Sequence, residues 1–213
     1  MRPTDRRLSA TFAAAVLALA LAAGAASAAT ETLNLDSSHT RVGFSIRHFF
    51  TPVRGEFKNV KGTIALDQAN LKESKVEVAI ETASINTNNE KRDNHLRSAD
   101  FFDAEKNPTI TFVSKTIDVK DNKGTMTGDL TMHGVTRPVT LAVEVGGIGK
   151  MGQGTIAGFT ASGKIDRKDY GLTWNKTLDQ GGTMLGDDVT LEITVEAKTP
   201  PPPKPAETAA TGK

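Results

Sequence analysis

The feature of this sequence that most constrains its fold is the alternation of apolar and polar residues along residues 31–198. In residues 189–196, valine, leucine or isoleucine occupies every second position, and threonine or glutamate occupies the positions between. Similar runs cover residues 42–46, 76–80 and 139–145. A period of two places apolar side chains on one face of a strand and polar ones on the other, which is typical of an antiparallel sheet with one buried face. The sequence therefore predicts an all-β fold.

Weaker alternation and turn residues complete the predicted sheet. Further strands are expected at residues 32–35, 57–66, 109–119, 125–132 and 154–166. Turns rich in glycine, asparagine and aspartate are expected at residues 121–124, 146–147, 181–182 and 186–188. A total of about eight or nine strands favours a closed barrel over a sandwich, because closure removes exposed sheet edges. Such a barrel is just wide enough for packed side chains or one slender ligand.

One charged segment, residues 88–103, interrupts the strands. Residues 90–97 within it are mostly good helix formers, and Thr87 or Asn88 can cap the helix start. The apolar pair Phe101-Phe102 follows the helix. The sequence therefore predicts a lid or plug over an apolar interior, and a covered barrel of this kind is a container suited to lipids.

Residues 1–29 have the pattern of a bacterial secretory signal peptide. They combine a basic start, a run rich in alanine and leucine, and small residues at 26–28 before a cleavage site. The apolar run is shorter than the roughly 20 residues that a membrane-spanning helix needs. We expect cleavage after Ala28 or Ala29 and release of a soluble protein into the periplasm.

The rest of the chain is expected to form one domain, residues 30–198, followed by a disordered, proline-rich tail at residues 199–213. The chain has no cysteine, so its stability has to come from an apolar core and not from disulfides. Three of the 26 basic residues and one of the 25 acidic residues lie in residues 1–29, which leaves the remainder with a net charge of about −1. This balance argues against nucleic-acid binding and against an electrostatic membrane-binding patch. Stable membrane insertion is not expected.

No catalytic motif stands out in the sequence. The histidines are His39, His48, His95 and His133, and none has a neighbour at the spacing of metal ligands. Residues 158–163 lack the spacing of a nucleophile elbow, and without cysteine there is no thiol nucleophile. The residues therefore give no support for an enzyme, a metal site or a cofactor.

Two aromatic pairs and the polar edge of the helix are the remaining candidate binding features. Phe49-Phe50 and Phe101-Phe102 are expected near strand ends, where they either plug the barrel as core or form a hydrophobic mouth. Arg92 and His95 either stabilise the helix surface or face the polar head of a lipid. From the residues alone, both interpretations stay open.

Several runs of residues resemble the YceI-like family of periplasmic proteins. The most specific is Arg92-Asp93-x-His95-Leu96-x-Ser98-x-Asp100-Phe101-Phe102. The others, in chain order, are residues 38–48, 107–114, 128–139, 158–159 and 165–171. The resemblance extends over nearly the whole predicted domain. It departs from the family at Tyr170, where phenylalanine is common, and in the additional tail.

This resemblance implies an eight-stranded antiparallel barrel with a lipocalin-like architecture and one short helical insertion. It also implies a carrier or reservoir that holds a polyisoprenoid, an isoprenoid quinone or a fatty-acid derivative in an elongated apolar cavity, without a catalytic reaction. The inward residues expected to contact the lipid are Val42, Phe44, Ile46, Val78, Ile80, Phe112, Leu130, Leu141, Val143, Leu191 and Ile193. Phe101, Phe102 and Trp174 are expected to close the cavity ends, with Arg92 and His95 as head-group candidates.

Two other functions stay open at this point. The first is a periplasmic enzyme on the same barrel, with His39, His95 or Asp169 as acid or base toward a lipid-like substrate. The second is an interaction module whose tail recruits a protein partner. The sequence leaves the identity of the lipid open, and it is compatible with a monomer or a homodimer.

Overall fold

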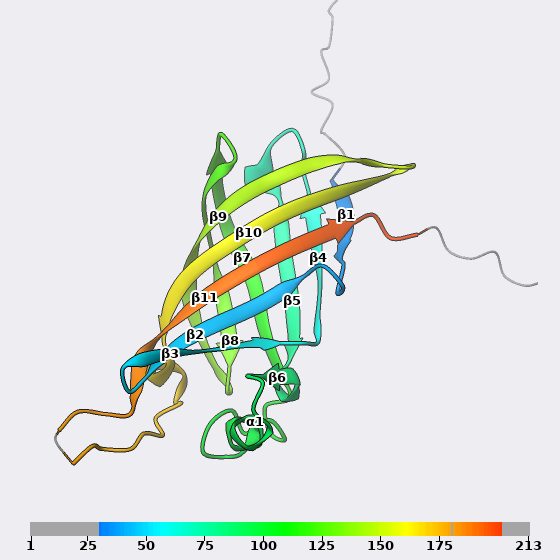
Figure 1. Ribbon diagram of the computed structural model, residues 1–213. Helices are drawn as coiled ribbons and strands as arrows, with labels where there is room; N and C mark the ends of the chain where they lie inside the picture. The colour runs from blue at the N-terminus through cyan, green and yellow to red at the C-terminus, as the bar shows by residue number, and fades with distance from the viewer. Residues whose placement is uncertain (1–29, 180, 202–213) are drawn as a thin grey trace, which may run out of the picture.

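The computed structural model describes residues 30–179 and 181–201 (Figure 1). The predicted signal peptide lies outside these described residues, and so do residues 202–213 of the predicted tail. The strands wrap around a common axis to form a tall barrel, and a short helix lies below one end of it (Figure 1). We call the end next to this helix the lower end.

In the part of the chain that the structure describes, eleven strands form one antiparallel sheet. In chain order they are β1 (Glu31–Leu35), β2 (Arg41–His48), β3 (Thr51–Phe57), β4 (Val60–Leu66), β5 (Lys75–Glu81), β6 (Ile85–Asn86), β7 (Thr109–Lys120), β8 (Lys123–Met132), β9 (Val135–Met151), β10 (Gly154–Asp166) and β11 (Leu185–Lys198). The helix α1 spans Glu90–Arg97, and the 3-10 turns are η1 (Leu71–Glu73), η2 (Thr82–Ser84) and η3 (Arg167–Tyr170).

Eight of the strands close into a ring. They follow one another in the order β1-β4-β5-β7-β8-β9-β10-β11, and β11 then pairs with β1 through Asn34↔Lys198 and Leu35↔Ala197. The prediction of an eight-stranded antiparallel barrel with one short helix is therefore confirmed. This closure gives the backbone N–H and C=O groups of β1 and β11 hydrogen-bond partners, so that these strands are not exposed sheet edges where they pair.

Below its contact with β1, strand β11 pairs with β2 instead, from Leu185↔His48 to Thr194↔Arg41. Strand β3 pairs along the other side of β2, and β3 in turn pairs with the two-residue strand β6. The β2–β3 hairpin thus extends the barrel wall at the lower end, where β6 connects directly to α1 (Figure 1).

The alternation in the sequence decides which face of each strand is buried. On β9, Val139 and Leu141 are 7% and 4% exposed, whereas Thr140 between them is exposed. The inward side chains of β4, β5, β7, β8, β9 and β10 form one large apolar cluster together with Tyr170 and Leu172 below them. A second cluster, which includes Leu33 and Ala197, lies where β1 meets β11.

Four details differ from the sequence-based expectations. Residues 186–188 are no turn but lie inside β11, where its pairing with β2 is irregular. The strand expected at residues 57–66 is two strands, β3 and β4, with a turn at Lys58-Asn59. Gly146-Gly147 is no turn but lies inside β9, next to an irregularity in the pairing of β9 with β10. The helix cap is Asn89, whose side-chain oxygen accepts a hydrogen bond from the Arg92 amide at 3.0 Å.

Candidate functional site

The barrel encloses a cavity of about 190 Å³ that is lined almost wholly by apolar side chains. It extends from Leu71 in η1, at the upper end, to Ile165 beside η3, at the lower end. Thirty residues line it, and the only polar ones among them are Thr40, Ser74 and Thr160. A small volume spread over so many residues is a narrow tube. None of the lining side chains is titratable.

Many of the residues predicted to contact a lipid line this cavity. They are Val42, Val78, Ile80, Phe112, Leu130, Leu141, Val143, Leu191 and Ile193. Phe44 and Ile46 lie on the same strand face as Val42 but nearer the lower end. The ring of Phe44 packs against that of Phe57 at a centroid distance of 5.9 Å, and Ile46 lies between Val53 and Val189 of the neighbouring strands. Their role as lipid contacts stays a prediction.

Other lining residues were not singled out from the sequence. They include Val60, Ile64, Ile110, Met126, Met132, Val139 and Ile165. Most of them lie on strands whose alternation is interrupted by glycine, threonine or methionine, so the same period-two signal was present but weaker.

The segment that follows α1 lies below the lower end of the barrel (Figure 1). Phe102 packs edge-on against Phe57, which lines the cavity, at a centroid distance of 5.9 Å. Phe101 is 7% exposed and packs against Trp174 at 5.1 Å and His95 at 5.0 Å. Phe101, Phe102 and Trp174 do not line the cavity, and their role in closing its end stays a prediction.

The polar edge of α1 holds the helix in place. The Arg92 guanidinium donates hydrogen bonds to the hydroxyl and the carbonyl oxygen of Thr87 at 2.7 and 2.9 Å. Asp93, which is 5% exposed, accepts from the Thr87 amide at 2.9 Å. His95 lies 2.8 Å from a carboxylate oxygen of Asp100. Both head-group candidates, Arg92 and His95, thus have partners in their own segment.

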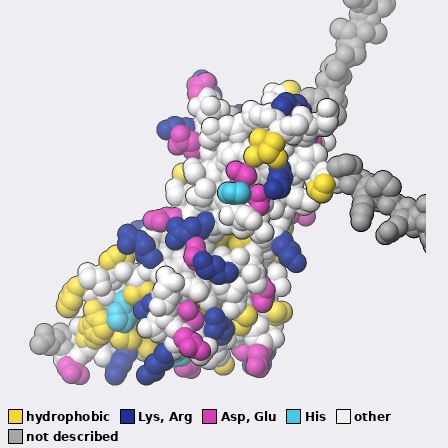
Figure 2. Space-filling view, turned by 45° about the vertical axis from the view of Figure 1, so that its right-hand side comes forward, with side chains coloured by type: hydrophobic (Ala, Val, Ile, Leu, Met, Phe, Trp, Pro, Cys, Tyr) yellow, Lys and Arg dark blue, Asp and Glu magenta, His cyan; other side chains and the backbone are white. Residues whose placement is uncertain are grey.

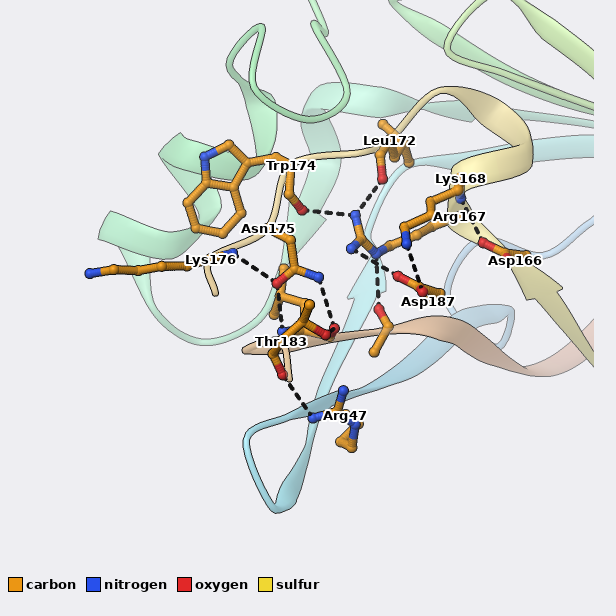
Figure 3. Close-up of polar contacts among 12 residues, drawn as sticks. Arg47, Asp166, Arg167, Lys168, Leu172, Trp174, Asn175, Lys176, Thr183 and Asp187 are labelled. Atoms are coloured by element: carbon orange, nitrogen blue, oxygen red, sulfur yellow. Dashed lines mark hydrogen bonds and ion pairs between the residues drawn. The ribbon is translucent and has the colours of Figure 1, made fainter. Parts of the chain in front are cut away.

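A buried arginine ties together the other segment at the lower end (Figure 3). Arg167 is 3% exposed, and its guanidinium donates to the carbonyl oxygens of Leu172, Trp174 and Gly186 and to the carboxylate of Asp187. The Asp187 pKa is lowered, first by the hydrogen bond from Lys168 and also by the charge of Arg167. Sequence reasoning missed this role, because its partners are mostly backbone oxygens that carry no side-chain signal.

Two hydroxyl groups are buried without a hydrogen-bond partner within residues 30–179 and 181–201, those of Thr82 and Tyr170. Both lie at the lower end, in η2 and η3. Burial raises the pKa of Tyr170 to about 12, so its phenol is neutral at physiological pH.

A polar cluster lies where the barrel closes, near β1 and β11. Asp36 contacts His39 Nδ1 at 3.0 Å and Lys198 Nζ at 2.8 Å, and Glu196 lies 3.5 Å from His39. The hydrogen bond from Lys198 holds the Asp36 pKa well below its usual range, and the bond to Asp36 raises the pKa of His39. Asp36, His39 and Glu196 are the one group in the described part of the chain whose possible ligand atoms lie close enough together to hold a metal ion. The ammonium of Lys198 already donates a hydrogen bond to a carboxylate oxygen of Asp36 in this group.

The proposed acid and base residues do not converge. His39 follows β1, His95 is on α1 and Asp169 is in η3, and none of them lines the cavity. The geometry instead provides an apolar tube whose lining side chains carry no titratable group. In the described residues, no helix has the length and apolar character needed to cross a membrane.

Comparison with known proteins gives matches over the whole barrel. A family model described as "YceI-like domain" matches residues 33–197. A UPF0312 protein of Staphylococcus epidermidis is 40% identical over 166 residues, which are 76% of this chain and 95% of that protein. A UPF0312 protein of Photorhabdus laumondii is 43% identical over 144 residues, which are 67% of this chain and 75% of that protein.

Solved structures share the architecture. The crystal structure of the Campylobacter jejuni YCEI protein is 38% identical, has a TM-score of 0.64, and matches 71% of this chain and 88% of its own. Burkholderia cenocepacia BcnA, at 24% identity, has a TM-score of 0.66 over 76% of this chain and 98% of its own. A polyisoprenoid binding domain from Saccharophagus degradans is 14% identical, with a TM-score of 0.57 over 80% of this chain and 99% of its own. The last two show likeness of fold alone.

Proposed function

This chain belongs to the YceI-like domain family, and from that premise we propose that it binds a long apolar chain inside its barrel. The ligand class is a polyisoprenoid, an isoprenoid quinone or a fatty-acid derivative. The protein holds it as a soluble carrier or reservoir in the periplasm and does not transform it chemically. A neighbour of the same fold is described as a polyisoprenoid binding domain, which supports this choice of ligand.

The observation that carries the proposal is the composition of the cavity wall, in which 27 of the thirty lining residues are apolar and none is titratable. Each methylene that leaves water contributes about 0.8 kcal/mol, so a linear hydrocarbon binds such a wall without any charged contact. The same wall offers no titratable acid or base to a substrate, and therefore none that could activate the hydroxyls of Thr40, Ser74 and Thr160, which disfavours the enzyme alternative.

The width of the tube sets the shape of the ligand. A cavity of roughly 150 Å³ accommodates benzene, so the 190 Å³ available here suits a segment of a slender chain better than a fused-ring lipid. A longer chain has to displace side chains of the wall. Met126 and Met132 line the cavity, and the flexible methionine side chain adapts to such changes.

A pair of tryptophan substitutions on β11 tests cavity binding. Ile193 faces the cavity, whereas Thr194 beside it is exposed. We expect Ile193→Trp to fill the tube and to remove the lipid found by mass spectrometry in an organic extract of the purified protein. Thr194→Trp should retain the lipid found with the unmodified protein. An unmodified protein that yields no lipid and takes up none when it is added would contradict the proposal.

The proposed location rests on the secretory pattern of residues 1–29. Expression of the full chain should give a periplasmic protein whose first residue is Ala29 or Thr30, measured by cell fractionation and intact-mass analysis. A protein that stays in the cytoplasm with its first 29 residues attached would contradict this part of the proposal.

A further inference from the structure

The turn between β2 and β3 presents two phenylalanines to solvent, which we call the aromatic tip. Phe50 is 96% exposed and Phe49 is 38% exposed. Exposed large apolar side chains are uncommon in the described part of the chain. Among residues 30–179 and 181–201, the only others are Val113, on β7, and Met151, at the end of β9. Fully exposing a phenylalanine forgoes the burial energy that would stabilise the fold, so the position invites a functional explanation.

The backbone holds this tip in a strained shape. Phe49 has a φ of +52°, in the left-handed region that bulky residues rarely adopt. The Phe49 amide donates to the Met184 carbonyl at 2.7 Å, and Arg47 Nη1 donates to the Phe49 carbonyl at 2.8 Å. The His48 ring packs edge-on against the Phe49 ring at a centroid distance of 4.6 Å. The tip is therefore fixed by its neighbours, and its exposure is not the result of a loose loop.

Two arginines of the same hairpin flank the tip. Arg47 and Arg54 are exposed residues on the two strands of this hairpin, and neither lies within salt-bridge distance of a carboxylate in the described residues. Figure 2 shows hydrophobic side chains gathered at the lower end of the molecule, with both basic and acidic side chains among and beside them. The near-neutral charge of the whole chain does not reveal this local arrangement.

We propose that the aromatic tip docks the barrel reversibly on an anionic lipid bilayer. Aromatic side chains favour the boundary between head groups and acyl chains, and arginines beside them pair with anionic head groups. The inference goes beyond cavity binding, because it names the surface at which a lipid carrier meets the membrane.

The size of the apolar surface favours a bilayer over a protein partner. A phenylalanine side chain buries roughly 150–250 Å², and Phe49 is only 38% exposed. The exposed area of the tip is therefore well under half of the roughly 800 Å² that each side of a stable protein interface typically buries. A membrane has no such lower limit, since each inserted side chain contributes independently of the others. Two phenylalanines thus suit a reversible membrane contact.

Vesicle flotation tests the docking without reference to the cavity. The protein is purified from the soluble extract of cells that express the full chain, its N-terminus is determined, and it is mixed with vesicles of phosphatidylcholine alone or with an equal part of phosphatidylglycerol. We expect Phe50→Ser to lower the partition coefficient on mixed vesicles by roughly tenfold. Arg54→Gln should lower it by roughly fivefold on the mixed vesicles only.

Met151→Ser is the matched control, because it removes a half-exposed apolar side chain from the opposite end of the barrel (Figure 1). Its flotation should equal that of the unmodified protein. Equal flotation of Phe50→Ser and the unmodified protein would overturn the proposal. The proposal would also be overturned if the unmodified protein did not float but formed a dimer in sedimentation velocity, and if Phe50→Ser made that dimer dissociate.

The lipid content of the same preparations separates this inference from the cavity proposal. Phe50→Ser should carry as much extractable lipid as the unmodified protein, because the aromatic tip does not line the cavity. Flotation that depends on Phe50 in a protein without extractable lipid would sustain the docking and contradict cavity binding. Extractable lipid in a protein that never floats would contradict the docking alone.

Discussion

Replacing Arg167 with methionine tests how far one buried side chain holds the lower end of the barrel together. Methionine has a similar length and is apolar, so it fills the space without creating a large cavity. It donates no hydrogen bond, and it leaves the carbonyl oxygens of Leu172, Trp174 and Gly186 without the donor that Arg167 provides.

The expected loss follows from the burial of these groups. An unpaired buried acceptor costs about 1–3 kcal/mol, and part of the segment can regain water because Asp187, the charged partner, is 39% exposed. We therefore expect Arg167→Met to lower the free energy of unfolding by about 3 kcal/mol. At about 2–4 °C per kcal/mol for a domain of this size, the melting temperature should fall by roughly 10 °C.

Lys168→Met is the control, because Lys168 pairs with the same Asp187 at 2.8 Å but is 46% exposed. An exposed ion pair contributes less than about 1 kcal/mol. Scanning calorimetry of the two variants and the unmodified protein gives the comparison. If the two variants melted at the same temperature, the reasoning that the buried carbonyls depend on Arg167 would be wrong.

Two further predictions concern α1 and the β1–β11 closure. Asp93→Ala removes the acceptor of the Thr87 amide and should lower the free energy of unfolding, measured in urea, by about 1–3 kcal/mol. The exposed neighbour Asn94→Ala is the control. An Asp93→Ala loss no larger than that of the control would contradict the prediction. Because the pKa of His39 is raised above 6.5, its contact with Asp36 stabilises the fold below that pH, and the contribution is lost as the pH rises through the raised pKa. The pKa of Asp36 is lowered below 3.8, so Asp36 stays charged, and its own stabilising contribution is lost only at strongly acid pH. Thermal melting from pH 5 to 9 should show a stability loss that His39→Gln removes, and an unchanged pH profile in that variant would refute the assignment.

The barrel and much of its interior could be predicted from the sequence, because period two fixes the face of each residue once a strand is placed. Leu191 and Ile193 face the cavity for this reason. The prediction failed on β3, where Pro52 and Gly55 are residues that usually argue against a strand. Gly55 leaves room for the ring of Phe44, because a Cβ atom at this position would overlap that ring unless it shifted.

The polar clusters could not be predicted, since they join residues that are distant in sequence or backbone atoms. Asp36 and Lys198 are 162 positions apart and meet only because the barrel closes between β1 and β11. Arg167 is one of many arginines in the sequence, and its burial depends on how the segment after η3 folds back. Neither arrangement leaves a local pattern of spacing or composition.

The cavity wall is also part of the buried core that stabilises the fold, because Ile80, Phe112 and Leu141 belong to both. A bound chain would complete that core from within, and by mass action it would stabilise only the folded state. Loaded and empty molecules would then differ in resistance to proteases, so a cell would clear empty barrels sooner. The abundance of this protein would follow the supply of its ligand without any dedicated regulator.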